Sequence, residues 1–134
     1  MFKQPLQGSI VIDLDKEFPN VVQKTLTEVI ASRRSLRKYK DINLSKEEVT
    51  YLLWETSRVD SYKEGVTFRT IPTGGATNSM ETYVYLNKVE GLEKGLYLYV
   101  QDKHQLTLLD DSKGLEEKVN NALYGQLRGA AVVF

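Results

Sequence analysis

Apolar residues recur with a helical period in two segments of the first half of the chain. One apolar helical face is formed by Val22, Leu26, Val29 and Ile30. This spacing predicts a first helix that ends near the arginines that follow it. A second helix is predicted from Ser45, which forms a capping-box sequence with Glu48, to about Val59. Trp54 is expected to anchor this second helix in the core or in an interface.

The second half of the chain has the apolar runs and the turn residues of strands. The segments "ETYVYLN", "GLYLYV" and "QLTLL" are separated by Gly-containing or polar turns and predict an antiparallel meander. "SIVIDL" near the N-terminus is predicted to be extended. Ser112 is predicted to cap a third helix, and "GAAVVF" to start a last strand. We expect this last strand to pair in the sheet or with another chain, because otherwise it leaves an open edge.

Residues 59–79, "VDSYKEGVTFRTIPTGGATNS", separate these two halves and show no clear period. Gly65, Pro72, Gly74 and Gly75 mark irregular backbone in this segment. The pattern therefore predicts one long loop or lid.

Composition is that of one ordinary globular domain, without repeats or linkers that divide it. The chain has 134 residues, of which 41% are hydrophobic and 27% charged, and its 18 basic residues balance its 18 acidic ones. A net charge of zero gives no global attraction to nucleic acid or to an anionic membrane, so an anion site must be local. We expect a single domain over residues 1–134, a cytoplasmic location, and neither a nucleic-acid nor a membrane partner.

Few side chains in the sequence could perform difficult chemistry. There is no cysteine, and His104 is the single histidine. Without cysteine there is no thiolate nucleophile and no Cys-ligated metal. No G-x-S-x-G or similar context accompanies His104, so an exposed turn residue is favoured over a catalytic triad. We therefore expect no catalytic side chain and no metal site, and a bound cofactor as the source of any difficult chemistry.

The segment "RRSLRKY" places four cations in seven residues. In one interpretation, these cations oppose the negative end of the first helix's dipole, each stabilising by about 0.3–1 kcal/mol. In the other, Arg33, Arg34 and Arg37 form a phosphate clamp to which the Ser35 hydroxyl adds a further donor. Charge pattern alone favours the first interpretation.

The segment "RTIPTGGATNS" is the second candidate element. Gly74 and Gly75 allow close approach of a flat ligand or a positive φ, and Pro72 stiffens the entry. Thr73 and Asn78 offer side-chain hydrogen bonds. An ordinary surface turn uses the same residue types, so this segment alone is weak evidence for a site.

Taken together and in order, these segments resemble the FMN-dependent nitroreductase superfamily, in particular its SagB-type dehydrogenase branch with the azoline oxidases of thiazole/oxazole peptide biosynthesis. The resemblance runs from about Val21 to the last residue. It rests on "RRSLRKY", "INLSKEEVTYLLWETS", "RTIPTGGATNSMETYVYL", "VEGLEKGLYLYVQDKHQLTLL" and "NALYGQLRGAAVVF". Thr73 stands at a position where this branch usually has serine, and threonine retains the hydroxyl group.

The resemblance implies an α+β fold, with a mainly antiparallel sheet flanked by helices, and a homodimer that holds FMN at its interface. It implies that the phosphate and ribityl end of FMN is held by Arg33, Arg34, Ser35 and Arg37. It also implies that the Pro72 loop lies against a flavin ring bound mainly to the other subunit; its cofactor-binding candidates are Pro72, Thr73, Gly74, Gly75 and Asn78. The implied activity is two-electron hydride transfer to or from a small molecule or a peptide, with NAD(P)H as an electron donor.

Members of this superfamily continue well beyond the position of Phe134, so the resemblance also implies that the chain is a shortened, partial domain. Three hypotheses follow. The chain is a flavin oxidoreductase, alone or completed by a complementing chain; or it is a dimerising or binding module that holds no FMN; or it is an unrelated α+β domain whose arginines cap a helix. Flavin content distinguishes the first from the second.

Overall fold

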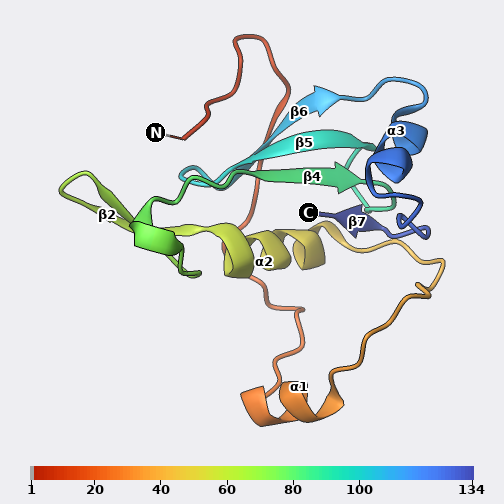
Figure 1. The fold of residues 1–134 in the computed structure, drawn as a ribbon, viewed down its shortest axis with the longest axis horizontal. Coiled ribbons are helices and arrows are strands. Elements are labelled where there is room, and N and C mark those ends of the chain that lie inside the picture. The colour runs from red at the N-terminus through yellow and green to blue at the C-terminus, as the bar shows by residue number, and fades with distance from the viewer. Residues whose placement is uncertain (1) are drawn as a thin grey trace.

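The computed structural model describes residues 2–134 and is built on a five-stranded antiparallel sheet with the order β1-β6-β5-β4-β7 (Figure 1). The strands are β1 (Val11–Asp13), β4 (Thr82–Leu86), β5 (Gly95–Val100), β6 (Gln105–Asp110) and β7 (Val132–Val133). The predicted meander is confirmed as β4-β5-β6. The predicted N-terminal and C-terminal strands are confirmed as well: β1 pairs with β6, and β7 pairs with β4.

Helix α2 (Lys46–Ser57) covers one face of this sheet. The predicted capping box is present, since the Ser45 hydroxyl accepts from the Glu48 backbone and the Glu48 carboxylate accepts from the Ser45 backbone. The helix buries Val49 and Leu53 in a core cluster whose other buried members are Leu14, Val84, Leu86, Val89, Tyr97, Tyr99 and Leu106. Burial of this apolar surface is the main force that fixes α2 on the sheet.

Helix α3 (Leu115–Ala122) packs on a second cluster with Tyr85, Leu127 and Ala130. Tyr85 alternates along β4 with residues of the first cluster, so α3 covers the opposite face of the sheet. The prediction that Ser112 caps this helix is wrong. The cap is Gly114, whose φ of 84° is left-handed and costs glycine little. This conformation starts the helix two residues later than the serine suggests.

The segment predicted to be one long loop contains a β-hairpin, which corrects that prediction. Strand β2 (Val59–Lys63) pairs antiparallel with β3 (Val66–Arg69). The two residues between them, Glu64 and Gly65, have φ values of 50° and 84°, the left-handed pair that two-residue hairpin turns require. Loop structure resumes only after β3, where a 3-10 turn, η1 (Gly74–Ala76), follows.

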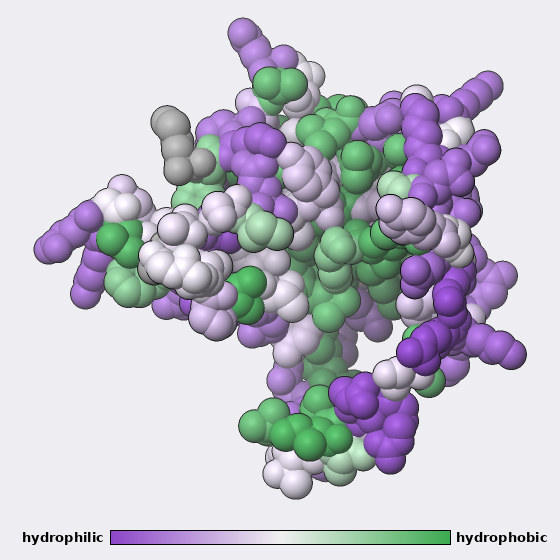
Figure 2. Space-filling model, in the orientation of Figure 1, coloured by the Kyte–Doolittle hydropathy of each residue, from purple (hydrophilic) through white to green (hydrophobic). Residues whose placement is uncertain are grey.

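Helix α1 (Leu26–Ser32) confirms the position of the first predicted helix, and its apolar face is exposed. The helix lies below the rest of the molecule and is joined to it by two extended segments (Figure 1). Apolar residues, coloured green, cover part of its surface (Figure 2). Leu26 and Ile30 are 75% and 66% exposed. Within residues 2–134, none of the helices is long and apolar enough to cross a membrane.

The prediction that His104 is an exposed turn residue is wrong, because its side chain is 2% exposed. It lies in the β5–β6 turn with a φ of 55°. Its Nε2 lies 2.7 Å from the Asp15 carbonyl oxygen, its Nδ1 lies 2.7 Å from the Tyr99 hydroxyl, and Trp54 packs edge-to-face on the ring. The His104 side chain can point inward because these groups satisfy both of its ring nitrogens under the cover of α2.

Candidate functional site

The basic segment 33–38 leaves the C-terminal end of α1. Arg33 is the C-cap, and its backbone N–H donates to the Val29 carbonyl. The Arg34 guanidinium donates to the carbonyls of Ala31 at 3.0 Å and Arg33 at 2.8 Å. Arg34 therefore binds the exposed carbonyls at the helix end, as the helix-dipole interpretation expects.

The remaining groups of this segment are available to an anion. Arg33, Ser35, Arg37 and Lys38 are exposed, and Arg33 Nη1 lies 3.4 Å from the Ser35 hydroxyl oxygen. Among the ion pairs of residues 2–134, none involves a cation of this segment. Its positive charge is therefore not neutralised by a neighbouring carboxylate, and a guanidinium and a hydroxyl already lie together.

The loop after β3 is held in shape by Thr73 and Asn78. The Thr73 hydroxyl accepts from the Asn78 backbone N–H at 3.1 Å and donates to the Asn78 side-chain oxygen at 3.2 Å. The Asn78 amide nitrogen also donates to the carbonyl and hydroxyl of Thr67 in β3. These two predicted site residues thus fix the loop to the hairpin, and the backbone around Gly74 is what the loop presents outward.

The two glycines of this loop differ in what they require. Gly75 has a φ of 60°, which L side chains rarely adopt. Gly74 has no such φ, and a Cβ added there would meet no atom within 4 Å. Nothing within the described chain therefore demands a glycine at position 74. Its open face, beside the exposed Pro72, fits a surface that another molecule approaches closely.

Arg69 is a structural residue of this region that the sequence interpretation did not assign to the site. Its guanidinium donates to the backbone carbonyls of Asn78 at 3.2 Å and Met80 at 3.4 Å and lies over the Phe2 ring at 5.3 Å. Burial lowers the pKa of Arg69 from its usual value. Its place at the start of "RTIPTGG" is the signal that could have identified it. Arg69 anchors the end of the loop that Thr73 and Asn78 shape.

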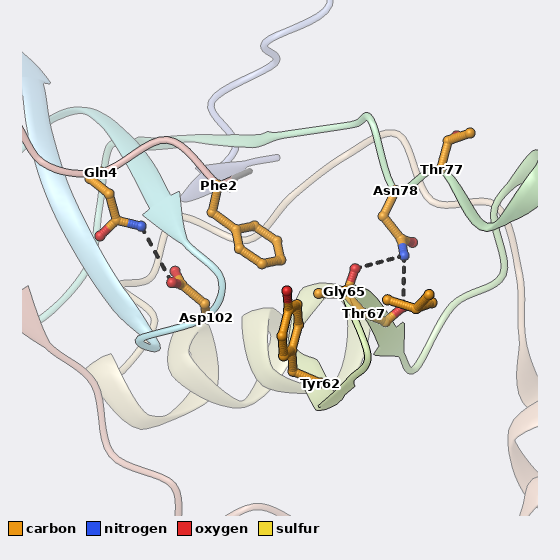
Figure 3. Close-up of a pocket in the computed structure, with 9 residues that line it drawn as sticks. Phe2, Gln4, Tyr62, Gly65, Thr67, Thr77, Asn78 and Asp102 are labelled. Carbon is orange, nitrogen blue, oxygen red and sulfur yellow. Dashed lines mark hydrogen bonds between the residues drawn. The ribbon is translucent and has the colours of Figure 1, made fainter.

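A cavity of about 690 Å³ opens between the hairpin, the N-terminal segment and the β5–β6 turn (Figure 3). It is lined by Phe2, Gln4, Tyr62, Gly65, Val66, Thr67, Thr77, Asn78 and Asp102. Asn78 is the one predicted site residue in this lining. The predicted arginines lie elsewhere, and within residues 2–134 no group of His, Cys, Asp and Glu side chains could hold a metal ion.

The structure keeps the two predicted halves of the site apart within one chain. The segment that leaves α1 rises on the right of Figure 1, whereas the hairpin and the loop that follows it lie on the left. The first half comprises Arg33, Arg34, Ser35 and Arg37, and the second comprises Pro72, Thr73, Gly74, Gly75 and Asn78. The two halves therefore lie on different sides of the molecule in this view.

Comparison with known proteins places the chain among proteins of one kind. Residues 30–133 match the sequence model of the Nitroreductase family. A protein of Methanocaldococcus jannaschii named "Putative nitroreductase" is 31% identical over 104 residues, which are 77% of this chain and 51% of that protein. The chain thus spans about half the length of this curated relative.

The fold of this chain is similar to those of two crystal structures whose proteins are also described as "putative nitroreductase". The one from Anabaena variabilis has a TM-score of 0.60 and 24% identity, and the match covers 78% of this chain and 22% of that chain. The one from Ralstonia eutropha has a TM-score of 0.61 and 23% identity, over 85% of this chain and 50% of that chain. The predicted nitroreductase-like α+β fold is therefore confirmed.

Proposed function

Because the chain belongs to the nitroreductase family, we propose that it forms the FMN site of a flavin-dependent oxidoreductase, assembled from two chains. In this proposal Arg33, Arg37 and Ser35 hold the phosphate, with Arg34 at the helix end beside them. The observation that carries the proposal is the exposed basic segment, whose cations have no ion-pair partner among the described residues. Guanidinium groups suit the phosphate because they donate two parallel hydrogen bonds.

The loop of a second chain would lie against the isoalloxazine ring of FMN. The open face of Gly74 supports this role, since a ring can approach the backbone there without meeting a side chain. Thr73 and Asn78 act by holding the loop's shape. FMN, when bound, supplies two-electron chemistry by accepting and releasing hydride. The chain's own residues bind and orient it, and none of them needs to be a catalyst.

A second copy of the chain is the partner that we propose for the exposed apolar face of α1. Leu26 and Ile30 contribute to this face and are largely exposed, which is unfavourable for an isolated chain in water. Packing of α1 against a second copy would bury this apolar face. It would also place the adjacent basic segment next to the partner chain. A complementing chain of another sequence is the alternative occupant.

For the substrate, we propose a small molecule or peptide of the kind that SagB-type dehydrogenases oxidise, with reduction of a nitro or quinone compound by NAD(P)H as the alternative. The motif "RTIPTGG" supports the SagB-type branch. We also propose that residues 1–134 act together in one domain, in the cytoplasm. The alternative function is a dimerising or binding module without FMN, for which the exposed apolar face of α1 would provide a contact surface.

The double variant Arg33→Ala/Arg37→Ala tests the phosphate clamp. We expect it to lose saturable FMN uptake while its far-UV circular dichroism and unfolding midpoint stay unchanged, because both side chains are exposed. The matched control is Lys103→Ala/Lys113→Ala, which removes two exposed cations outside the segment and should bind FMN as the wild type does. FMN uptake that is equal in both double variants would refute the clamp.

A further inference from the structure

The cavity shown in Figure 3 is walled by segments that are far apart in the sequence. Phe2 comes from the N-terminal segment, Tyr62 from β2 and Asp102 from the β5–β6 turn, and the two aromatic rings point toward the same space. Its volume of about 690 Å³ lies within the range of about 300–1,000 Å³ that small-molecule sites occupy. The fold thus brings two rings and a carboxylate to one opening.

Contacts within the chain hold these walls in place. Arg69 packs on the Phe2 ring and donates to the Asn78 carbonyl, so one side chain links two walls. The Asn78 amide in turn donates to Thr67. On the other side, Gln4 Nε2 donates to Asp102 at 3.3 Å. These bonds reduce the side-chain freedom that a ligand would otherwise have to remove on binding.

The lining has a distinct chemical character. Asp102 is the one charged residue among those that line the cavity, and no Lys or Arg belongs to the lining. The other polar groups come from neutral side chains, and the Asn78 amide nitrogen is already bound to Thr67. The carboxylate therefore favours a ligand that donates hydrogen bonds, and the aromatic rings favour a flat one.

We propose that this cavity binds a planar aromatic ligand that carries a protonated amine. The ring of the ligand packs against Phe2 and Tyr62, and Asp102 accepts from the ammonium group. The site needs no flavin and lies within one chain. Because it shares Asn78 with the loop proposed to approach FMN, a ligand bound here sits beside that loop.

Three indole probes that differ in charge test the site: tryptamine, tryptophol and indole-3-acetate. Binding to the flavin-free, full 134-residue chain is followed by ligand-observed saturation-transfer NMR. We expect tryptamine to bind about two- to fivefold more tightly than tryptophol, as an exposed ion pair allows, and indole-3-acetate to bind most weakly. Asp102→Asn should remove the difference between tryptamine and tryptophol.

Tyr62→Ala should weaken tryptamine and tryptophol alike, by about tenfold. Tyr62 is 68% exposed, so this variant should fold. The control is Tyr124→Ala, which removes a ring that is 91% exposed and lies outside the cavity, and it should bind as the wild type does. Absence of binding, equal binding of all three probes, or equal loss in both tyrosine variants would overturn the proposal. Because no flavin is present, none of these results depends on the FMN site.

Discussion

His104 shows how a residue's surroundings determine its chemistry. The Asp15 carbonyl can only accept a hydrogen bond, so the Nε2 atom that faces it at 2.7 Å carries the proton. Nδ1 of the neutral ring then accepts from the Tyr99 hydroxyl. Burial lowers the pKa of His104, and the positive charge of Lys16 lowers it further, against an opposing effect of Asp15. The histidine is thus held neutral as a structural residue.

This arrangement predicts a pH dependence of stability. The unfolded chain takes up a proton at His104 near pH 6.5, whereas the folded chain does so only at lower pH. The free energy of unfolding should therefore fall as the pH drops below about 6.5 toward the lowered folded-state pKa. Urea unfolding between pH 7.5 and 5.5 measures this slope.

The variant His104→Asn supplies the control, because asparagine tolerates the positive φ at this position. It should be less stable at pH 7.5 by roughly 1–3 kcal/mol, since the buried Tyr99 hydroxyl loses its acceptor. Its slope between pH 7.5 and 5.5 should be shallower than that of the wild type. If the free energy of unfolding changed with pH in the same way in both proteins, His104 would not be the cause of the pH dependence.

Gly74 and Gly75 give a matched pair of residue-scale predictions. Gly74→Ala meets open space, so its stability should stay the same or rise by up to about 1 kcal/mol, while its FMN affinity should fall. Gly75→Ala should lower stability by roughly 1–2 kcal/mol, because its φ of 60° is left-handed. Chemical unfolding and FMN titration of both variants separate backbone strain from ligand approach. An unchanged FMN affinity in Gly74→Ala would contradict close approach at this position.

At the scale of elements, local patterns identified most of the fold. The capping-box pair of Ser45 and Glu48 fixed the start of α2, and the apolar runs located the meander. The hairpin was missed because polar residues dominate β2, which packs little of its surface into the core. The turn residues Glu64 and Gly65 were the sequence feature from which the hairpin could have been predicted. The helical spacing of apolar residues predicted α1. This spacing does not show whether the apolar face of the helix packs against the same chain or against another one.

Helix α1 carries a prediction about assembly. The double variant Leu26→Asp/Ile30→Asp should shift the chain from dimer to monomer in sedimentation equilibrium, because it places charges in the proposed interface. Thr27→Asp is the control on the same helix, where the exposed residue is already polar, and it should remain dimeric. Both double-variant side chains are exposed within one chain, so the folding of each chain should persist. A monomeric wild type would refute the proposed role of α1.

At the scale of the whole molecule, the sequence named the two halves of the candidate site but not their relative position. "RRSLRKY" and "RTIPTGG" are local features and can be recognised in one dimension. Their separation depends on where α1 projects and on how the hairpin carries the loop, which the folded sheet determines (Figure 1). The cavity likewise depends on Phe2, Tyr62 and Asp102 meeting from distant segments. Local sequence patterns do not show which distant segments lie together in the folded chain.

The central claim is that one FMN site uses the basic segment of one chain and the loop of another. The most direct test mixes Arg33→Ala/Arg37→Ala with Gly74→Phe, in which the ring occupies the open face of the loop, and measures FMN uptake after subunit exchange. Each variant alone should bind no FMN, and the wild type should bind it saturably. The mixture should regain up to about a quarter of the wild-type capacity, because half of the dimers are mixed and each holds one intact site. No recovery, or a wild type that ignores FMN, would contradict the shared site.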